Sequence, residues 1–356
     1  MKKIGVSVLI IMFAIGLAGN FQLAEAKSDK SIVLRMSSPW PERGLIPEMT
    51  KWWGSEVEKR TNGKIKIQYY WGGMLGTIKE NFYTLERGVC DIAVMAPYIF
   101  EEELPLSMVG TCLVGTFEND PIVTSNAWRQ MTKEFPQMLR EWENSNQKLL
   151  IGWETGPYLW LSKNPIKSFK DFKGKKTGLT GGKSARELYK ELGSIPISIS
   201  PVKVYDALNK GTMEFRPATT HMVTRYKYYE AAKYLTDVGR GCLGSPVYAM
   251  AINLDKWNSL PSSLQEIILD VNKDWWDNFE KVIKGSLNEN REFLTKNGVT
   301  FTDFSQEDKT KFQTLPVYKI YKQKFIERVK NAGYSSQLGE KMYNRYRELI
   351  EKGGKN

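Results

Sequence analysis

Segments with strand and helix patterns alternate along the first part of the chain, separated by short turns. Residues 32–36 have a strand pattern, and residues 45–61 carry apolar side chains at helical spacing. Residues 64–71 alternate between apolar and polar, and a helical segment at 77–87 and an apolar strand at 91–95 follow. Parallel strands need a crossover such as a helix to join them. This order therefore predicts a mainly parallel sheet covered by helices.

A second block repeats the alternation. Its strand patterns lie at 149–154, 159–162, 176–179 and 197–199, and its helical patterns lie at 183–192 and 202–208. The last third of the chain is largely helical. A helix start at Pro261, with Ser262 or Ser263 as cap, opens a run without proline that reaches about Lys296. A helix of that length is long for a globular domain, so we expect it to span two lobes.

The N-terminus has the three parts of a secretory signal peptide. A positive start precedes an apolar run at residues 4–17, and Ala24-Glu25-Ala26 forms a small-x-small cleavage pattern. The apolar run is shorter than the roughly 20 residues that a membrane span needs. We therefore expect residues 1–26 to be removed and the mature protein to work in the periplasm.

Composition excludes several classes of protein. The net charge is +11, but the basic residues are scattered among acidic ones, which is typical of a solvated surface and not of a nucleic-acid partner. A single histidine, His221, excludes a histidine-rich metal site, and no cofactor motif follows a strand. Cys90, Cys112 and Cys242 allow one disulfide and leave one thiol over, and we expect at least two of them to be buried thiols.

These features together predict an α/β protein with the two-lobed fold of periplasmic binding proteins. The 356 residues are enough for two domains. We assign 27–154 and 245–285 to lobe I, and 155–244 and 286–356, with the C-terminal helices, to lobe II. In such a fold, a solute lies in the cleft and the lobes close around it by a hinge.

Five motifs, in order along the chain, resemble those of the solute-binding proteins of tripartite ATP-independent periplasmic (TRAP) transporters, the DctP family. They are Gly73-x-Leu75-Gly76, Leu85-x-x-Gly88-x-x-Asp91-Ile92, and the segments 168–176, 201–211 and 257–265. The resemblance implies a type II-like receptor that captures a small organic solute, usually a carboxylate. It also implies delivery to the membrane subunits of a TRAP permease driven by an ion gradient, with no chemistry on the solute. We expect a monomer.

The resemblance also exposes a departure from the family pattern. The family holds the ligand carboxylate with an arginine that falls here at Gly178, and a second basic position falls at Tyr158. A guanidinium binds a carboxylate through two parallel hydrogen bonds, so its loss matters. Arg216 is the first candidate for a replacement, unless it is exposed or paired with Glu214.

Weaker cationic candidates lie elsewhere. Arg43 lies in the first loop, where a helix N-terminus could help to hold an anion, although a solvated loop charge is the alternative. Lys183 follows two glycines that could equally form a turn. His221 could donate a hydrogen bond to a ligand or serve a structural purpose.

Aromatic residues could take over recognition. Ring faces suit flat or apolar ligands and also attract cations. The candidates for cleft walls are Trp40, Trp71, Tyr98, Trp153, Tyr158 and Trp160.

Three functional hypotheses follow. The first is a TRAP-type receptor for an organic acid with an aromatic or bulky body. The second is the same fold binding a neutral or cationic solute through aromatic walls. The third is a sensory receptor that presents its liganded form to a membrane signalling protein. An enzyme is disfavoured, because one histidine serves no convincing catalytic triad.

Overall fold

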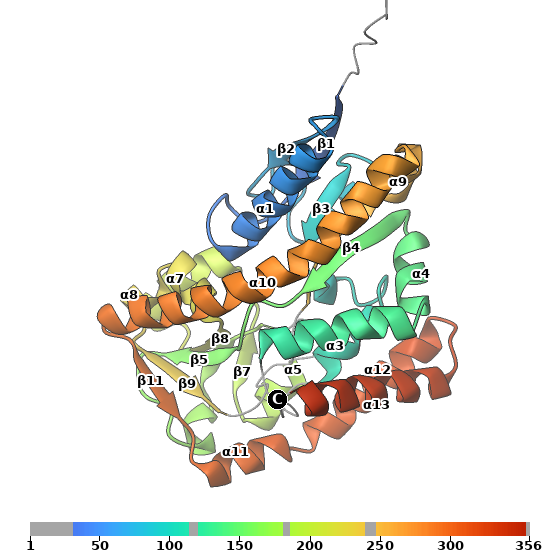
Figure 1. Ribbon diagram of the computed structural model, residues 1–356. Coiled ribbons are helices and arrows are strands. Elements are labelled where there is room, and N and C mark those ends of the chain that lie inside the picture. The colour runs from blue at the N-terminus through green and yellow to red at the C-terminus, as the bar shows by residue number, and fades with distance from the viewer. Residues whose placement is uncertain (1–30, 114–119, 181–185, 239–246, 354–356) are drawn as a thin grey trace, which may run out of the picture.

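The computed structural model describes residues 31–113, 120–180, 186–238 and 247–353. Within them, two β-sheets with covering helices form two lobes, as Figure 1 shows. The first sheet has the order β2-β1-β3-β10-β4 and the second the order β11-β9-β5-β8-β6-β7. The predicted α/β class and two-lobed fold are confirmed. The predicted signal peptide lies outside the described residues.

Lobe I begins with the predicted alternation. Its first elements are β1 (Ile32–Ser37), α1 (Leu45–Arg60), β2 (Ile65–Tyr70), α2 (Asn81–Glu86) and β3 (Ile92–Met95). Strand β1 lies between β2 and β3 and pairs in parallel with both, which confirms the parallel arrangement.

A strand from much later in the chain completes the first sheet. Strand β10 (Tyr248–Asn253) lies between β3 and β4 (Gln147–Trp153) and is antiparallel to both. All its residues are buried, as expected for a strand with neighbours on both sides. The lobe also contains η1 (Pro97–Ile99), η2 (Ser107–Leu113), α3 (Pro121–Glu134), α4 (Gln137–Glu143) and α9 (Leu254–Ser259).

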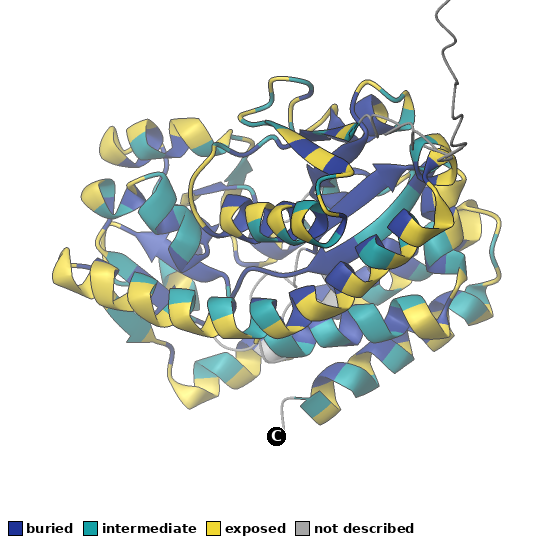
Figure 2. Cartoon of the chain, turned by 45° about the horizontal axis from the view of Figure 1, so that its top comes forward, coloured by how far each residue is buried: buried dark blue, intermediate teal, exposed yellow. Residues whose placement is uncertain are grey.

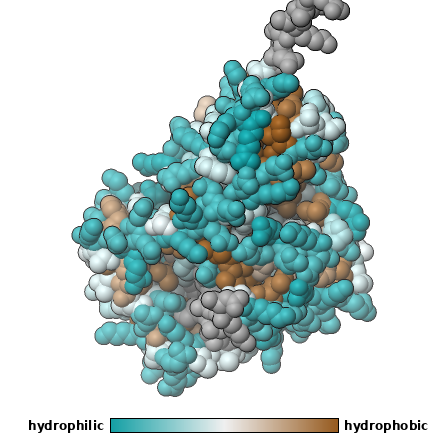
Figure 3. Space-filling view, viewed as in Figure 1, coloured by the Kyte–Doolittle hydropathy of each residue, from teal (hydrophilic) through white to brown (hydrophobic). Residues whose placement is uncertain are grey.

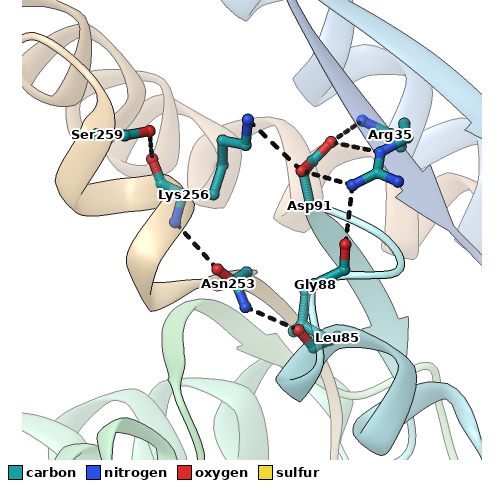
Figure 4. Close-up of polar contacts among 7 residues, drawn as sticks. All are labelled: Arg35, Leu85, Gly88, Asp91, Asn253, Lys256 and Ser259. Carbon is teal, nitrogen blue, oxygen red and sulfur yellow. Dashed lines mark hydrogen bonds and ion pairs between the residues drawn. The ribbon is translucent and has the colours of Figure 1, made fainter.

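The Gly88–Asp91 motif ties the turn before β3 to β1 (Figure 4). The Asp91 carboxylate accepts hydrogen bonds from the Arg35 backbone N–H at 2.8 Å and from its Nε at 3.0 Å. Arg35 Nη2 also donates to the carbonyl of Gly88, which has a φ of +70° that favours glycine. Lys256 Nζ approaches Asp91 at 3.8 Å. This motif is therefore structural.

The second sheet is built from short strands. They are β5 (Leu159–Ser162), β6 (Lys176–Gly178), β7 (Ile195–Ile197), β8 (Phe215–Ala218), β9 (Tyr234–Asp237) and β11 (Thr300–Asp303). The strand predicted at 197–199 forms two residues earlier, where its backbone pairs in parallel with β6. The connecting elements are η3 (Phe169–Phe172), α5 (Arg186–Glu191), η4 (Pro201–Lys203), α6 (Val204–Asn209), α7 (Thr220–Arg225), α8 (Tyr228–Ala231) and α11 (Gln306–Gln313).

The long helix α10 (Ser262–Lys296) runs along both lobes, as predicted (Figure 1). Its first half packs against α1, where Trp53 Nε1 donates to Asn272 Oδ1 at 2.7 Å. Its second half packs against α7, where His221 Nε2 lies 2.8 Å from Ser286 Oγ. The predicted serine cap is wrong, because the helix follows Pro261 without a side-chain capping bond.

The C-terminal helices α12 (Val317–Asn331) and α13 (Ser336–Gly353) do not follow the sequence-based assignment to lobe II. Helix α13 packs against α3 of lobe I, because its apolar face joins the core cluster that contains Trp128 and Met131. Arg345 and Glu134 form an ion pair at 2.7 Å beside it. Helix α12 contacts both lobes: Tyr321 accepts a hydrogen bond from the Leu188 amide, and Arg328 pairs with Glu101.

Burial follows the layers. In Figure 2 most strand residues are buried, although β2, β7 and β11 carry exposed residues, and the helices turn exposed faces outward. Figure 3 shows hydrophilic side chains over most of the visible face, in keeping with the scattered charges of the sequence.

Cys90 is buried and not in a disulfide, whereas Cys242 and the side chain of Cys112 lie outside the described residues. No helix of the described residues is long and apolar enough to cross a membrane.

Candidate functional site

A cavity of about 740 Å³ lies between the lobes. Lobe I contributes the loop after β1 with the start of α1, the segment after β3, and Tyr248 of β10. Lobe II contributes the segments that follow β6, β7 and β8, together with α7. Several of these segments leave the carboxyl ends of parallel strands, which is where α/β folds bind ligands.

Arg216 on β8 is a buried charge in the cavity lining. Its side chain lines the cavity although the residue is only 3% exposed, and its Nε and Nη1 have no hydrogen-bond partner. Glu214 does not pair with it, because its Oε2 instead accepts a hydrogen bond from the Lys176 backbone at 2.8 Å. A buried guanidinium without a counter-ion is unfavourable, so it favours an anion in the cavity.

Aromatic side chains wall the cavity around this charge. Trp40 packs edge-on against Tyr248 with ring centroids 5.3 Å apart, and Tyr98 and Tyr158 complete the wall. Burial raises the pKa of Tyr98, Tyr158 and Tyr248, and the charge of nearby Arg216 opposes this for Tyr98 and Tyr158. All three phenols therefore stay neutral at physiological pH, and a neutral phenol can donate a hydrogen bond to a carboxylate.

Helix α7 places two polar groups on the cavity. His221 and Arg225 are four residues apart and so lie on one face of the helix. Burial and the neighbouring charge of Arg225 lower the pKa of His221 to about 4, so the ring is neutral near pH 7. Arg225 Nη2 donates to the carbonyl of Arg43 at 2.8 Å.

The structure brings six of the predicted site residues to the cavity lining: Trp40, Arg43, Tyr98, Tyr158, Arg216 and His221. Gly178 is not part of the cavity lining, but the two residues that follow it, Leu179 and Thr180, are.

Three predicted aromatic residues lie away from the cavity. Trp160 is fully buried in the core of lobe II, with ring centroids 4.7 Å from Phe172 and 5.6 Å from Tyr189. Trp71 instead stacks on Tyr69 at 5.2 Å. Trp153 is likewise a core residue, packed on Trp275 at 5.2 Å. Lys183 lies outside the described residues.

Sequence reasoning missed several lining residues, including Arg225 and Tyr248. Arg225 had a usable signal, because its four-residue spacing from His221 places both on one helical face. Tyr248 had none, because only the return of β10 to the first sheet brings it to the cleft.

The side chains that line the cavity are suited to binding a small solute. Within the described parts of the chain, no group of three or more His, Cys, Asp or Glu residues could hold a metal ion. A deep guanidinium, neutral phenols and aromatic walls can together hold a small anion with a flat or bulky body.

Comparisons with known proteins agree with this geometry. The sequence model described as "Bacterial extracellular solute-binding protein, family 7" matches residues 36–328. The uncharacterized protein YiiZ of Salmonella typhimurium is 30% identical over 190 residues, which cover 51% of this chain and 55% of that protein.

Two solved structures share the fold. A TRAP solute-binding protein of Rhodoferax ferrireducens, in complex with copurified benzoate, has a TM-score of 0.78 at 20% identity, covering 91% of this chain and 99% of that one. A marine metagenome TRAP solute-binding protein specific for aromatic acids, in complex with metahydroxyphenylacetate, has a TM-score of 0.79 at 18% identity, covering 90% and 99%. Since the family match spans most of the sequence, the chain belongs to bacterial extracellular solute-binding protein family 7, the DctP family of TRAP receptors.

Proposed function

We propose that this receptor captures a small organic acid and that Arg216 holds its carboxylate. The observation that carries the proposal is the buried guanidinium, whose Nε and Nη1 lack partners while the side chain lines the interlobe cavity. A carboxylate would supply both the missing hydrogen bonds and the missing counter-charge.

The cavity walls indicate the body of the acid. Trp40, Tyr98, Tyr158 and Tyr248 offer ring faces and edges to a flat or bulky apolar group. The benzoate and metahydroxyphenylacetate in the two related structures are acids of this kind. We therefore place aromatic monocarboxylates first among the candidate solutes.

The receptor would work in the periplasm after removal of residues 1–26 and pass its solute to the membrane subunits of a TRAP permease. The family match supports this expectation. Arg43 and His221 line the same cavity and would contribute to the selection of the solute.

A thermal-shift and calorimetric comparison of acids with their amides tests the proposal. The probes are benzoate with benzamide and 3-hydroxyphenylacetate with its amide, on protein refolded to remove carried-over solute. A probe at 100 times its Kd stabilises the protein by about 2.7 kcal/mol, which moves Tm by several degrees. We expect the acids to shift Tm and the amides to leave it unchanged.

The same probes are then applied to Arg216→Gln and to Lys203→Gln, which removes one exposed charge outside the cavity lining. Arg216→Gln should weaken the acids at least a hundredfold, since a charge-assisted bidentate pair is lost, while Lys203→Gln should bind like wild type. Equal binding of acids and amides would instead support the neutral-solute hypothesis.

A further inference from the structure

Arg225 joins the two lobes beside the mouth of the cavity. It ends α7 in lobe II, yet its Nη2 donates to the backbone carbonyl of Arg43 at 2.8 Å and approaches that of Pro41 at 3.4 Å. Both carbonyls belong to residues 38–44, the loop between β1 and α1 in lobe I, which we call the rim loop. Figure 1 shows α7 beside the end of α1 from which this loop leaves.

The surroundings of Arg225 do not account for it as an ordinary ion pair. No carboxylate among the described residues pairs with it, and its Nε is buried without a hydrogen-bond partner. The nearby charge is the like charge of Arg43, and the start of α1, which carries partial positive charge, is close. A Cβ at Gly44 would lie 3.8 Å from Arg225 Nε, in ordinary van der Waals contact, so the guanidinium lies directly beside the backbone of the rim loop. Its favourable contacts are the two carbonyls across the cleft and the Tyr226 ring, whose centroid lies 5.9 Å from the guanidinium carbon. Of these, the carbonyls join it to lobe I.

The rim loop forms part of the solute's enclosure. Trp40 and Arg43 of this loop line the cavity, and Trp40 packs on Tyr248 in the aromatic wall. A bond that holds the carbonyls of Pro41 and Arg43 to α7 therefore holds Trp40 against the place where a solute would lie.

We propose that Arg225 is a positioning residue that fastens the rim loop to lobe II and thereby sets the rate at which a bound solute leaves. The solute part of this inference rests on the proposed function, whereas the fastening does not. The bond crosses the cleft beside the cavity, so it must open before an enclosed solute can leave. Losing hydrogen bonds from a charged donor corresponds to about a tenfold faster release.

Hydrogen–deuterium exchange on the unliganded protein tests the fastening without any solute. In Arg225→Gln, the amides of residues 38–46 should exchange about tenfold faster than in wild type, because the loop opens more often. Lys203→Gln is the matched variant: it removes one exposed cation of lobe II outside the cavity lining, so exchange of residues 38–46 should stay at the wild-type rate. Unchanged exchange in Arg225→Gln would overturn the proposal.

Stopped-flow release of benzoate and 3-hydroxyphenylacetate tests the consequence. Arg225→Gln should speed the release of both acids by the same factor, about tenfold. Different factors for the two acids, or a slower association, would show that Arg225 contacts the solute directly and would refute the positioning role. If exchange rises as expected but neither acid binds wild-type protein, the fastening stands and the proposed function fails.

Discussion

A Cβ atom at Gly178 would lie 3.2 Å from Nη1 of Arg216. The position where the family places its carboxylate-binding arginine and the arginine that we propose as its replacement are therefore direct neighbours, one on β6 and the other on β8. In our proposal the carboxylate-binding cation therefore lies on the adjacent strand, and Gly178 leaves the room that the Arg216 guanidinium uses.

Restoring an arginine at position 178 should therefore not restore the family site. In Gly178→Arg, the new Cβ would meet Met213 Sδ at 2.6 Å and its charge would face Arg216. We expect lower stability than wild type and weaker benzoate binding, measured by urea denaturation and calorimetry. Gly178→Ala, which adds only the crowding, should lose about 1–3 kcal/mol of unfolding free energy. Tighter benzoate binding by Gly178→Arg would contradict this account.

Arg216 should be unfavourable for the unliganded fold. Its guanidinium is buried without a counter-ion, so Arg216→Met should raise the unfolding free energy of the solute-free protein by about 1–3 kcal/mol while abolishing benzoate binding. Urea denaturation after refolding measures the first effect and calorimetry the second. Arg328→Met is the contrasting control, because it leaves its partner Glu101 without that pair and should destabilise. A loss of stability in Arg216→Met would mean that the charge is already compensated in the solute-free protein.

The sequence predicted the elements that depend on local patterns and missed what depends on their assembly. The spacing of apolar residues was enough for β1 to β3, because a regular period needs no knowledge of neighbours. Helix α10 was predicted from its start at Pro261 and the run without proline that follows. The apolar face of α13 predicted a helix but not whether lobe I or lobe II would cover it.

The residues of the candidate site also divide into those that local patterns predicted and those that only the assembly of the fold brings to the cavity. Tyr158 and Trp160 were predicted together, yet Tyr158 precedes β5 and reaches the cavity while Trp160 packs inside the lobe core. Arg216 was found because it follows the family motif at 201–211, not because the strand β8 was predicted. Tyr248 and Arg225 were missed, because the pairing of β10 with β3 and the approach of α7 to the rim loop are contacts between distant parts of the chain.

The middle of α10 offers a stabilising substitution. A Cβ at Gly285 would meet no atom within 4 Å, and alanine has a higher helix propensity than glycine, so Gly285→Ala should add about 0.5–1 kcal/mol to the unfolding free energy. Gly152→Ala on β4 is the matched opposite, because its Cβ would lie 2.2 Å from Trp128 Cζ3, and it should destabilise strongly. Thermal denaturation of both variants measures the difference. Equal changes in Tm for the two variants would show that local packing does not determine the effect of alanine at these positions.

His221 should make the protein less stable in mild acid. Burial and the charge of Arg225 lower the pKa of this ring from 6.5 to about 4 in the folded state, so the unfolded chain binds a proton first as the pH falls. The contribution of the neutral ring is therefore fully present above about pH 6.5 and is lost as the pH falls through about 4, with a limit of about 3 kcal/mol. Urea denaturation between pH 7.5 and 4.5 measures this loss. Because the chain has one histidine, His221→Gln isolates the effect and should show a flatter pH dependence over that range. Carboxylates that titrate in the same range act equally in both proteins, so parallel curves would show that His221 is not the group responsible.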